Sequence, residues 1–168
     1  MTVRRRLARR GAPLRTASAI RPRVGVGAVV IHDGKVLLIR RAKEPLRGRW
    51  VVPGGTVEAG ETLHQALVRE VREETDLMVE PGEVLLVFDR VLRERGRLVY
   101  HYVIIDYLCR YVSGTPRAAS DAEAVALVAP AELSSYDLPR QALEVVLDAF
   151  RRRGVAVDAV LAPGTQAE

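Results

Sequence analysis

Hydrophobic positions near the front of the chain predict a β-hairpin. Residues 24–31, VGVGAVVI, are all apolar or glycine, and a second apolar run, KVLLIR, covers residues 35–40. Between them stands His32-Asp33-Gly34, and an Asp-Gly pair favours the tight turns that join antiparallel strands. The two runs therefore indicate paired strands, the first of them buried.

The next periodic segment predicts an amphipathic helix over residues 63–75. Its apolar residues recur at the intervals of one helical face and are Leu63, Ala66, Leu67 and Val71. Thr62 stands three residues before Gln65, which is the spacing of a capping box. The preceding residues 41–53 contain two prolines and a glycine and predict a loop.

The second half of the chain predicts further strands and a second helix. Segments rich in β-branched and aromatic residues cover residues 83–92, 97–112 and 124–129. Asp137 can cap a helix that starts at Pro139, and Gly154 can end it. The apolar face of that helix consists of Leu143, Val146, Leu147 and Phe150. The order of strands, helix, strands and helix favours an α/β fold with a mixed sheet between helices.

Length and composition fit one domain. The chain has 168 residues and a hydrophobic content of 48%, which suffices for a single well-packed core. No apolar run approaches the roughly 20 residues that a membrane-spanning helix needs, so no contact with a membrane interior is predicted. The lone Cys109 cannot form a disulfide within the chain, which favours a cytoplasmic location. Its apolar neighbours predict a buried side chain and no catalytic role.

The net charge of +5 is concentrated at the N-terminus. Of the 26 Lys and Arg residues, eight precede Val24, whereas the first of the 21 acidic residues is Asp33. We therefore predict a flexible basic extension over residues 1–22, a domain over residues 23–154 and a loose tail over residues 155–168. The extension resembles a transit peptide in composition, and contact with RNA or a membrane surface stays open. No specific nucleic acid is expected, because the interleaved aromatic residues of a strand-binding groove are lacking.

Three glutamates near the end of the first predicted helix point to metal chemistry. Glu70, Glu73 and Glu74 stand at i, i+3 and i+4, so their carboxylates converge on one patch. At about 100° per residue, Glu70 and Glu74 fall in line with the core-facing residues. A solvated acidic face explains most such runs, but like charges turned toward a core are costly. A hard cation removes the repulsion, and oxygen ligands favour Mg²⁺ or Mn²⁺.

Residues 55–77, GTVEAGETLHQALVREVREETDL, resemble the Nudix box. The residues that match this motif are Gly55, Glu61, Arg69, Glu70, Val71, Glu73, Glu74 and Leu77. One position departs from it, because the late glycine of the box is Asp76 here, a residue that tolerates left-handed backbone better than most. The resemblance covers residues 24–150 in strand order and implies a Nudix-type α/β/α sandwich.

The resemblance also implies roles for these side chains. The implied metal ligands are the carbonyl of Gly55 and the carboxylates of Glu70, Glu73 and Glu74. Glu73 is alternatively the base that activates water, and Arg69 pairs with Glu61 and holds Glu70 in place. The implied reaction is the Mg²⁺-dependent attack of water on a pyrophosphate within a nucleoside diphosphate that is linked to another group.

Substrate contacts outside the box are less marked. The candidates for stacking on a base are Trp50, Phe88, Tyr100 and Tyr102, and those for phosphate or ribose are Arg90, Arg93 and Arg97. Asp121 and Glu123 are candidate additional acids, and Trp50, Arg90, Asp121 and Glu123 are the four predicted substrate contacts. Residues 118–127 resemble the loop that follows the box in ADP-ribose pyrophosphatase-like members, which favours ADP-ribose or a related nucleotide sugar. Two alternatives stay open: a MutT-like nucleoside triphosphate pyrophosphohydrolase, and a non-catalytic module that senses a nucleotide. The expected partner is a nucleotide substrate, and a homodimer is possible.

Overall fold

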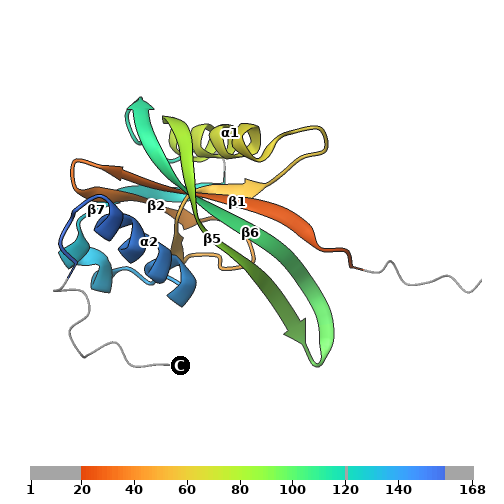
Figure 1. The fold of residues 1–168 in the computed structure, drawn as a ribbon. Coiled ribbons are helices and arrows are strands. Elements are labelled where there is room, and N and C mark those ends of the chain that lie inside the picture. The colour runs from red at the N-terminus through yellow and green to blue at the C-terminus, as the bar shows by residue number, and fades with distance from the viewer. Residues whose placement is uncertain (1–19, 120, 158–168) are drawn as a thin grey trace, which may run out of the picture.

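A mixed sheet between two helices forms the part of the chain that the computed structural model describes, residues 20–119 and 121–157. The elements follow in the order β1 (Arg23–His32), β2 (Lys35–Arg41), β3 (Trp50–Val51), β4 (Gly54–Thr56), α1 (Leu63–Thr75), β5 (Met78–Glu94), β6 (Arg97–Ser113), β7 (Ala122–Val128), a 3₁₀ helix (Pro130–Ser135) and α2 (Arg140–Arg152). Helices α1 and α2 lie on opposite sides of the sheet (Figure 1). The predicted α/β class is confirmed. The predicted basic extension up to residue 19 and the predicted tail from residue 158 lie outside the described residues.

Strand β1 organises the sheet. It pairs with β2 through an antiparallel hairpin and with β6 through a parallel ladder that runs from Arg23↔Tyr102 to Val30↔Cys109. The beginning of β1 also pairs with β4, while β2 pairs with β3 and β7. The predicted hairpin is confirmed, and its turn uses positive φ angles at Asp33 and Gly34. The parallel β1–β6 pairing joins segments more than 70 residues apart.

The hydrophobic core has two layers, one on each face of the sheet. Val30 and Leu37 face α1 and pack with Leu67 and Val71. Neighbouring residues of the same strands face α2 and pack with its apolar side, and they include Val29, Leu38, Val146 and Phe150. Because β1 and β2 are covered on both faces, their sequences are continuously apolar and do not alternate with polar residues.

Helix α1 has the predicted bounds, and its two ends are fixed by local contacts. The Thr62 side chain accepts a hydrogen bond from the Gln65 amide, and the Gln65 side chain accepts one from the Thr62 amide. At the other end Asp76 adopts a left-handed conformation with φ 60°, and its N–H donates to the Arg72 carbonyl. Asp76 thus takes the conformation that the late glycine of the Nudix box would be expected to supply.

Helix α2 corrects one prediction. Its N-cap is Pro139, and Asp137 makes no capping hydrogen bond. The Asp137 carboxylate instead accepts a hydrogen bond of 2.8 Å from Arg49 on the β2–β3 connection. It therefore binds a charged side chain and not the free amides at the start of α2. Burial of its apolar side against the sheet supports α2 without a side-chain cap.

Strand β5 begins earlier than the sequence predicted, at Met78 and not at Glu83. Pro81 and Gly82 lie within the strand, and the ladder with β6 accommodates them through register shifts between Pro81 and Val84. Val79 ahead of these shifts is buried against α1. Further differences are the short strand β3 within the predicted loop, the short strand β4 directly after it, and the 3₁₀ helix after β7.

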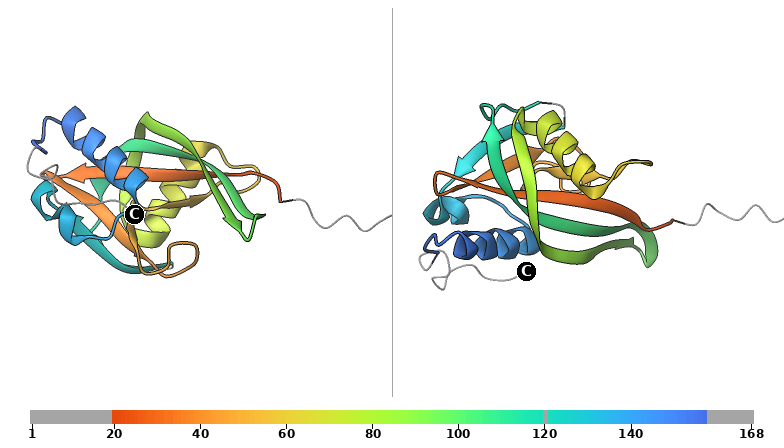
Figure 2. Two further views of the ribbon diagram at one scale, coloured as in Figure 1. Left: turned by 90° about the horizontal axis from the view of Figure 1, so that it is seen from below. Right: turned by 45° about the horizontal axis from the view of Figure 1, so that its top comes forward.

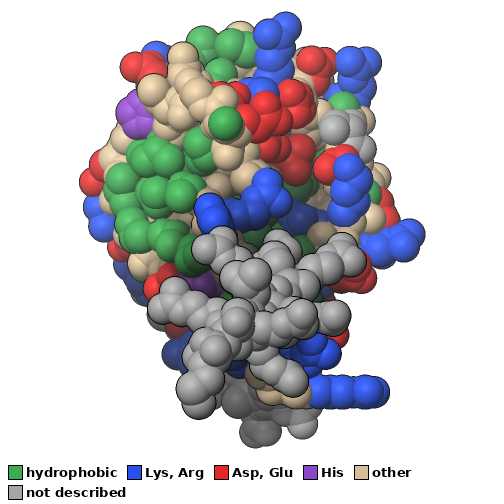
Figure 3. Space-filling view, turned by 90° about the vertical axis from the view of Figure 1, so that its right-hand side faces the viewer, with side chains coloured by type: hydrophobic (Ala, Val, Ile, Leu, Met, Phe, Trp, Pro, Cys, Tyr) green, Lys and Arg blue, Asp and Glu red, His purple; other side chains and the backbone are tan. Residues whose placement is uncertain are grey.

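The β5–β6 hairpin extends beyond both helices (Figure 2). Its far end leaves Val87, Val91 and Val99 exposed, and hydrophobic side chains gather on this end of the molecule (Figure 3). Cys109, near the other end of β6, is buried as predicted, and burial raises the pKa of its thiol to about 12. Within residues 20–119 and 121–157, no helix is long and apolar enough to cross a membrane.

The cap of α1 yields a first prediction. Thr62→Ala removes the side-chain acceptor for the Gln65 amide, so the free energy of unfolding should fall by about 1 kcal/mol. Urea denaturation checks the change. Thr62→Ser keeps a hydroxyl acceptor and should stay close to the unchanged protein, and equal loss in both variants would contradict a capping role.

Candidate active site

The carboxylate of Glu74 is buried beside the backbone of β4. Glu74 is only 4% exposed, and its Oε2 accepts a hydrogen bond of 2.8 Å from the Gly54 amide. Gly54 has φ 153°, and a Cβ atom there would collide with the Val26 carbonyl. The glycine therefore lets β4 approach β1 while its amide faces the carboxylate.

Glu70 lies one turn before Glu74 on the same side of α1. A Cβ atom on Gly55 would overlap the Glu70 carboxyl group, so the second glycine is needed for this close approach. Burial raises the pKa of Glu70. Burial also raises the pKa of Glu74 to about 8, and the charges of Glu70 and Asp121 act in the same direction. The two carboxylates thus form an acidic pair that is poorly solvated.

Arg69 ties this pair to the segment ahead of the helix. Its guanidinium donates to both oxygens of Glu61, at 2.7 and 2.8 Å, and to Glu70 Oε1 at 2.9 Å. A further bond of 3.1 Å reaches the Thr56 carbonyl at the end of β4. The pairing implied by the resemblance is therefore present, and one planar fork fixes helix, loop and strand together.

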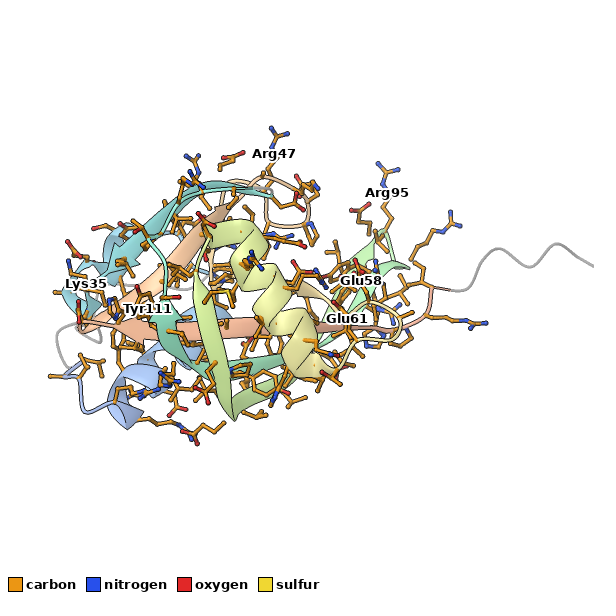
Figure 4. The ribbon with its side chains drawn as sticks, turned by 90° about the horizontal axis from the view of Figure 1, so that it is seen from above. Lys35, Arg47, Glu58, Glu61, Arg95 and Tyr111 are labelled. Carbon is orange, nitrogen blue, oxygen red and sulfur yellow. The ribbon has the colours of Figure 1, made fainter. Side chains whose placement is uncertain are left out.

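Glu61 is the charged anchor of this network. Hydrogen bonds from Arg69 and from the Glu58 amide lower the pKa of Glu61 to about 2. The hydrogen bond to Glu61 in turn raises the pKa of Arg69. Glu58 and Glu61 lie in the loop that enters α1 (Figure 4). Glu61 is thus ionised at neutral pH and serves to orient Arg69.

Glu73 is placed differently from the other two helix glutamates. Its side chain is 51% exposed, and its nearest cationic atom is Arg69 Nη1 at 3.6 Å. Among the described residues, no three His, Cys, Asp or Glu side chains form a cluster that could hold a metal ion. The structure therefore brings Glu70 and Glu74 together and leaves Glu73 at the solvent edge.

Comparison with known proteins identifies this arrangement. The family model of the NUDIX domain matches residues 21–149, which is most of the chain and includes β4, α1 and every residue of the Arg69 network. The chain belongs to the Nudix family. Its sheet and helices therefore form a Nudix fold, as the resemblance implied.

Similar proteins carry several different descriptions. An ADP-ribose pyrophosphatase of Methanocaldococcus jannaschii is 36% identical over 105 residues, which are 62% of this chain and 60% of that protein. A MutT-like protein of Streptomyces ambofaciens is 37% identical over 108 residues, which are 64% of each chain. A crystal structure of a MutT NUDIX hydrolase from Burkholderia pseudomallei has a TM-score of 0.63 and 34% identity, and it covers 79% of this chain and 98% of that one. The match thus spans less than two thirds of the curated relatives' own lengths.

The Nudix carboxylate pair fits a hard divalent cation. Glu70 and Glu74 offer oxygen ligands, and the raised pKa values report negative charge that burial leaves poorly compensated. The glycines at 54 and 55 keep side chains away from the space beside them. One or two carboxylates, completed by water and phosphate oxygens, are the usual protein ligands of Mg²⁺.

A cavity of about 500 Å³ opens beside the same glycines. Gly54, Gly55 and Thr56 form part of its wall. Aromatic and basic side chains from the sheet and the β2–β3 connection also line it: Phe88, Tyr100, Tyr102, Arg23, Arg41, Lys43 and Arg90. Tyr100 and Tyr102 stack with ring centroids 4.4 Å apart. This lining offers both flat π-faces and positive charge.

The four predicted substrate contacts divide into two groups. Arg90 lines the cavity, and Asp121 pairs at 2.6 Å with Lys43, which also lines it. Trp50 does not line the cavity, since its ring packs edge-on against Tyr136 at 5.0 Å. Glu123 pairs with arginines of the β2–β3 region, at 3.6 Å from Arg40. Neither Trp50 nor Glu123 thus lines the cavity, and both contact other side chains of the protein.

Sequence reasoning missed three residues of the cavity. Arg41 and Lys43 looked like ordinary loop cations, although Lys43 reaches Asp121 at 2.6 Å. Asp106 is 4% exposed on β6, and burial raises its pKa to about 6. A lone acid within the apolar run HYVIIDYLCRYV was the available signal for Asp106.

The raised pKa of Glu74 yields a prediction about metal-free stability. The unfolded chain releases this proton near pH 4.5 and the folded one near pH 8, so ionisation of Glu74 should destabilise the fold progressively as pH rises between these values. Glu74→Gln keeps an acceptor for the Gly54 amide and removes the charge. The melting temperature of Glu74→Gln in EDTA, relative to that of the unchanged protein, should therefore increase as the pH rises from about 5 to about 8. A constant difference across this range would contradict the burial of an ionisable Glu74.

The Arg69 network yields a prediction about Glu61. Arg69→Lys replaces a planar fork with a single ammonium that cannot hold both Glu61 oxygens and the Thr56 carbonyl. The pKa of Glu61, followed by NMR titration, should rise from about 2 toward its usual 4.5. Arg72→Lys on the exposed side of α1 is the matched control. An unchanged Glu61 pKa in Arg69→Lys would show that charge alone, without the fork, orients Glu61.

Proposed function

We propose that this Nudix protein is a Mg²⁺-dependent hydrolase that cleaves the pyrophosphate of a nucleoside diphosphate linked to another group. The favoured substrate is ADP-ribose or a related nucleotide sugar. The observation that carries the proposal is the shared wall: the β4 backbone that contacts Glu70 and Glu74 also borders a cavity lined by aromatic and basic side chains. Metal ligands and nucleoside contacts thus meet at one strand.

Each polar group of the site has a task in this reaction. Glu70, Glu74 and the Gly55 carbonyl would hold the cation, which when bound offsets negative charge on the pyrophosphate oxygens. Glu73, at the solvent edge, is the candidate base that takes the proton of the attacking water. Arg69 acts through Glu70 as a positioning residue, because its fork fixes the direction of that carboxylate.

The cavity supplies contacts to the rest of the substrate. The rings of Tyr100 and Tyr102 lie in its wall and offer a stacking surface for a base. Arg41 and Lys43 also line the cavity, and their charges suit phosphate oxygens. The pyrophosphate would then lie between these cations and the carboxylate pair, with the nucleoside extending across the sheet.

A MutT-like reaction is the second candidate. Two of the similar proteins are described as MutT-like or MutT, and a nucleoside triphosphate needs the same cation and the same cavity. A non-catalytic sensing module is disfavoured, because each carboxylate expected of the box is retained and the Arg69 network that orients them is complete. The cytoplasmic location and the homodimer stay predictions.

Product analysis separates the two reactions. With Mg²⁺ and ADP-ribose, we expect AMP and ribose 5-phosphate without inorganic pyrophosphate, whereas a MutT-like enzyme releases pyrophosphate from nucleoside triphosphates. Glu74→Gln should lower kcat at least about 100-fold under saturating Mg²⁺, since it removes ligand charge at constant shape.

The matched control is Glu94→Gln, a carboxylate at the tip of the β5–β6 hairpin, which should leave the rate unchanged. Pyrophosphate release with no turnover of ADP-ribose would replace the first candidate by the second. Full activity of Glu74→Gln would remove the carboxylate pair from the mechanism altogether.

A further inference from the structure

Asp106 is a buried acid in the wall of the cavity. It is 4% exposed. Within residues 20–119 and 121–157, no side chain or amide donates a hydrogen bond to it, and Arg90 acts on it only through its charge. The carboxyl group thus depends on the cavity for its hydrogen bonds.

The strand register fixes where Asp106 lies relative to the carboxylate pair. Gly27 of β1 pairs with Gly54 on one side and with Asp106 on the other, so the three residues form one rung across the sheet. At the usual strand spacing, Asp106 stands about 10 Å from Gly54, whose amide binds Glu74. Asp106 therefore lies away from the proposed pyrophosphate position beside Gly54, but both residues line the same cavity.

The Asp106 carboxyl group lies directly against the β1 backbone at Gly27. A Cβ atom on Gly27 would collide with the Asp106 carboxyl group, and one on Gly25 would press on Tyr102 at 3.3 Å. Both glycines line the cavity. Glycine at alternate positions of a strand weakens the strand and often marks a close approach of a ligand or backbone.

From this geometry we propose that Asp106 is the specificity-determining residue of the cavity and accepts a hydrogen bond from an exocyclic amino group of the substrate base. A carboxyl oxygen accepts from an amino N–H, whereas a carbonyl oxygen in the same place offers no proton and leaves the acid unpaired. A base such as adenine or cytosine is thus favoured over hypoxanthine or uracil. This inference rests on the proposed function, since it assumes that the cavity holds the nucleoside.

Nucleoside monophosphates test the inference without any hydrolysis. AMP and IMP differ at one position of the base, amino against oxo, and CMP and UMP differ in the same way. Calorimetry with the full chain and Mg²⁺ should give a dissociation constant about tenfold lower for the amino member of at least one pair. Equal affinities within both pairs of the unchanged protein would overturn the proposal, and this comparison requires no variant.

Asp106→Ala identifies the residue responsible. The variant should lose the preference because the amino member weakens to the level of its oxo partner, while the oxo member changes little. Persistence of the preference, or an equal loss for both members, would also overturn the proposal. Asp89→Asn is the matched control, because Asp89 lies on the same hairpin, is exposed and pairs with His101 at 3.1 Å. A preference that depends on Asp106 without turnover of ADP-ribose would uphold this inference while rejecting the proposed reaction.

Discussion

The buried carboxylate of Glu74 is the constraint around which the site is built. A helix that turns an acid toward the core needs a donor at that point, and the donor is the Gly54 amide. Only glycine can present this amide, because β4 lies too close to β1 for a side chain. The glycine pair, the orientation of α1 and the pairing of β4 with β1 are therefore consequences of one unfavourable burial, which a divalent cation would relieve.

Arg69 makes this arrangement rigid. Its guanidinium makes four hydrogen bonds, to Glu61, Glu70 and the Thr56 carbonyl, so a shift of the loop, the helix or β4 would break a charge-assisted bond. The hydrogen bonds from Arg69 lower the pKa of Glu61, whereas the pKa of Glu70 stays raised because burial outweighs the attraction of Arg69. The hydrogen bonds of Arg69 thus orient the carboxylates, and the negative charge of the pair remains available to a cation.

Local signals in the sequence were sufficient for some elements and not for others. Helix α1 was predicted at both ends because Thr62 and Gln65 form its cap within the segment itself. The cap assigned to Asp137 was wrong, since its partner Arg49 lies 88 positions away and competes with the helix amides. The parallel pairing of β1 with β6 is equally non-local. No periodicity within either strand specifies it.

The same limit explains why the proposed metal ligands were easier to predict than the cavity. Glu70 and Glu74 belong to one helix, so their convergence follows from helical spacing alone. Asp106 faces the cavity only because a parallel ladder sets it beside Gly27, and Gly27 is set beside Gly54 by a separate antiparallel ladder. The position of Asp106 relative to Gly54 can therefore be predicted only when both long-range strand registers are known. The proposed contact of Asp106 with the substrate thus depends on strand register, whereas the proposed metal ligands lie in one contiguous motif.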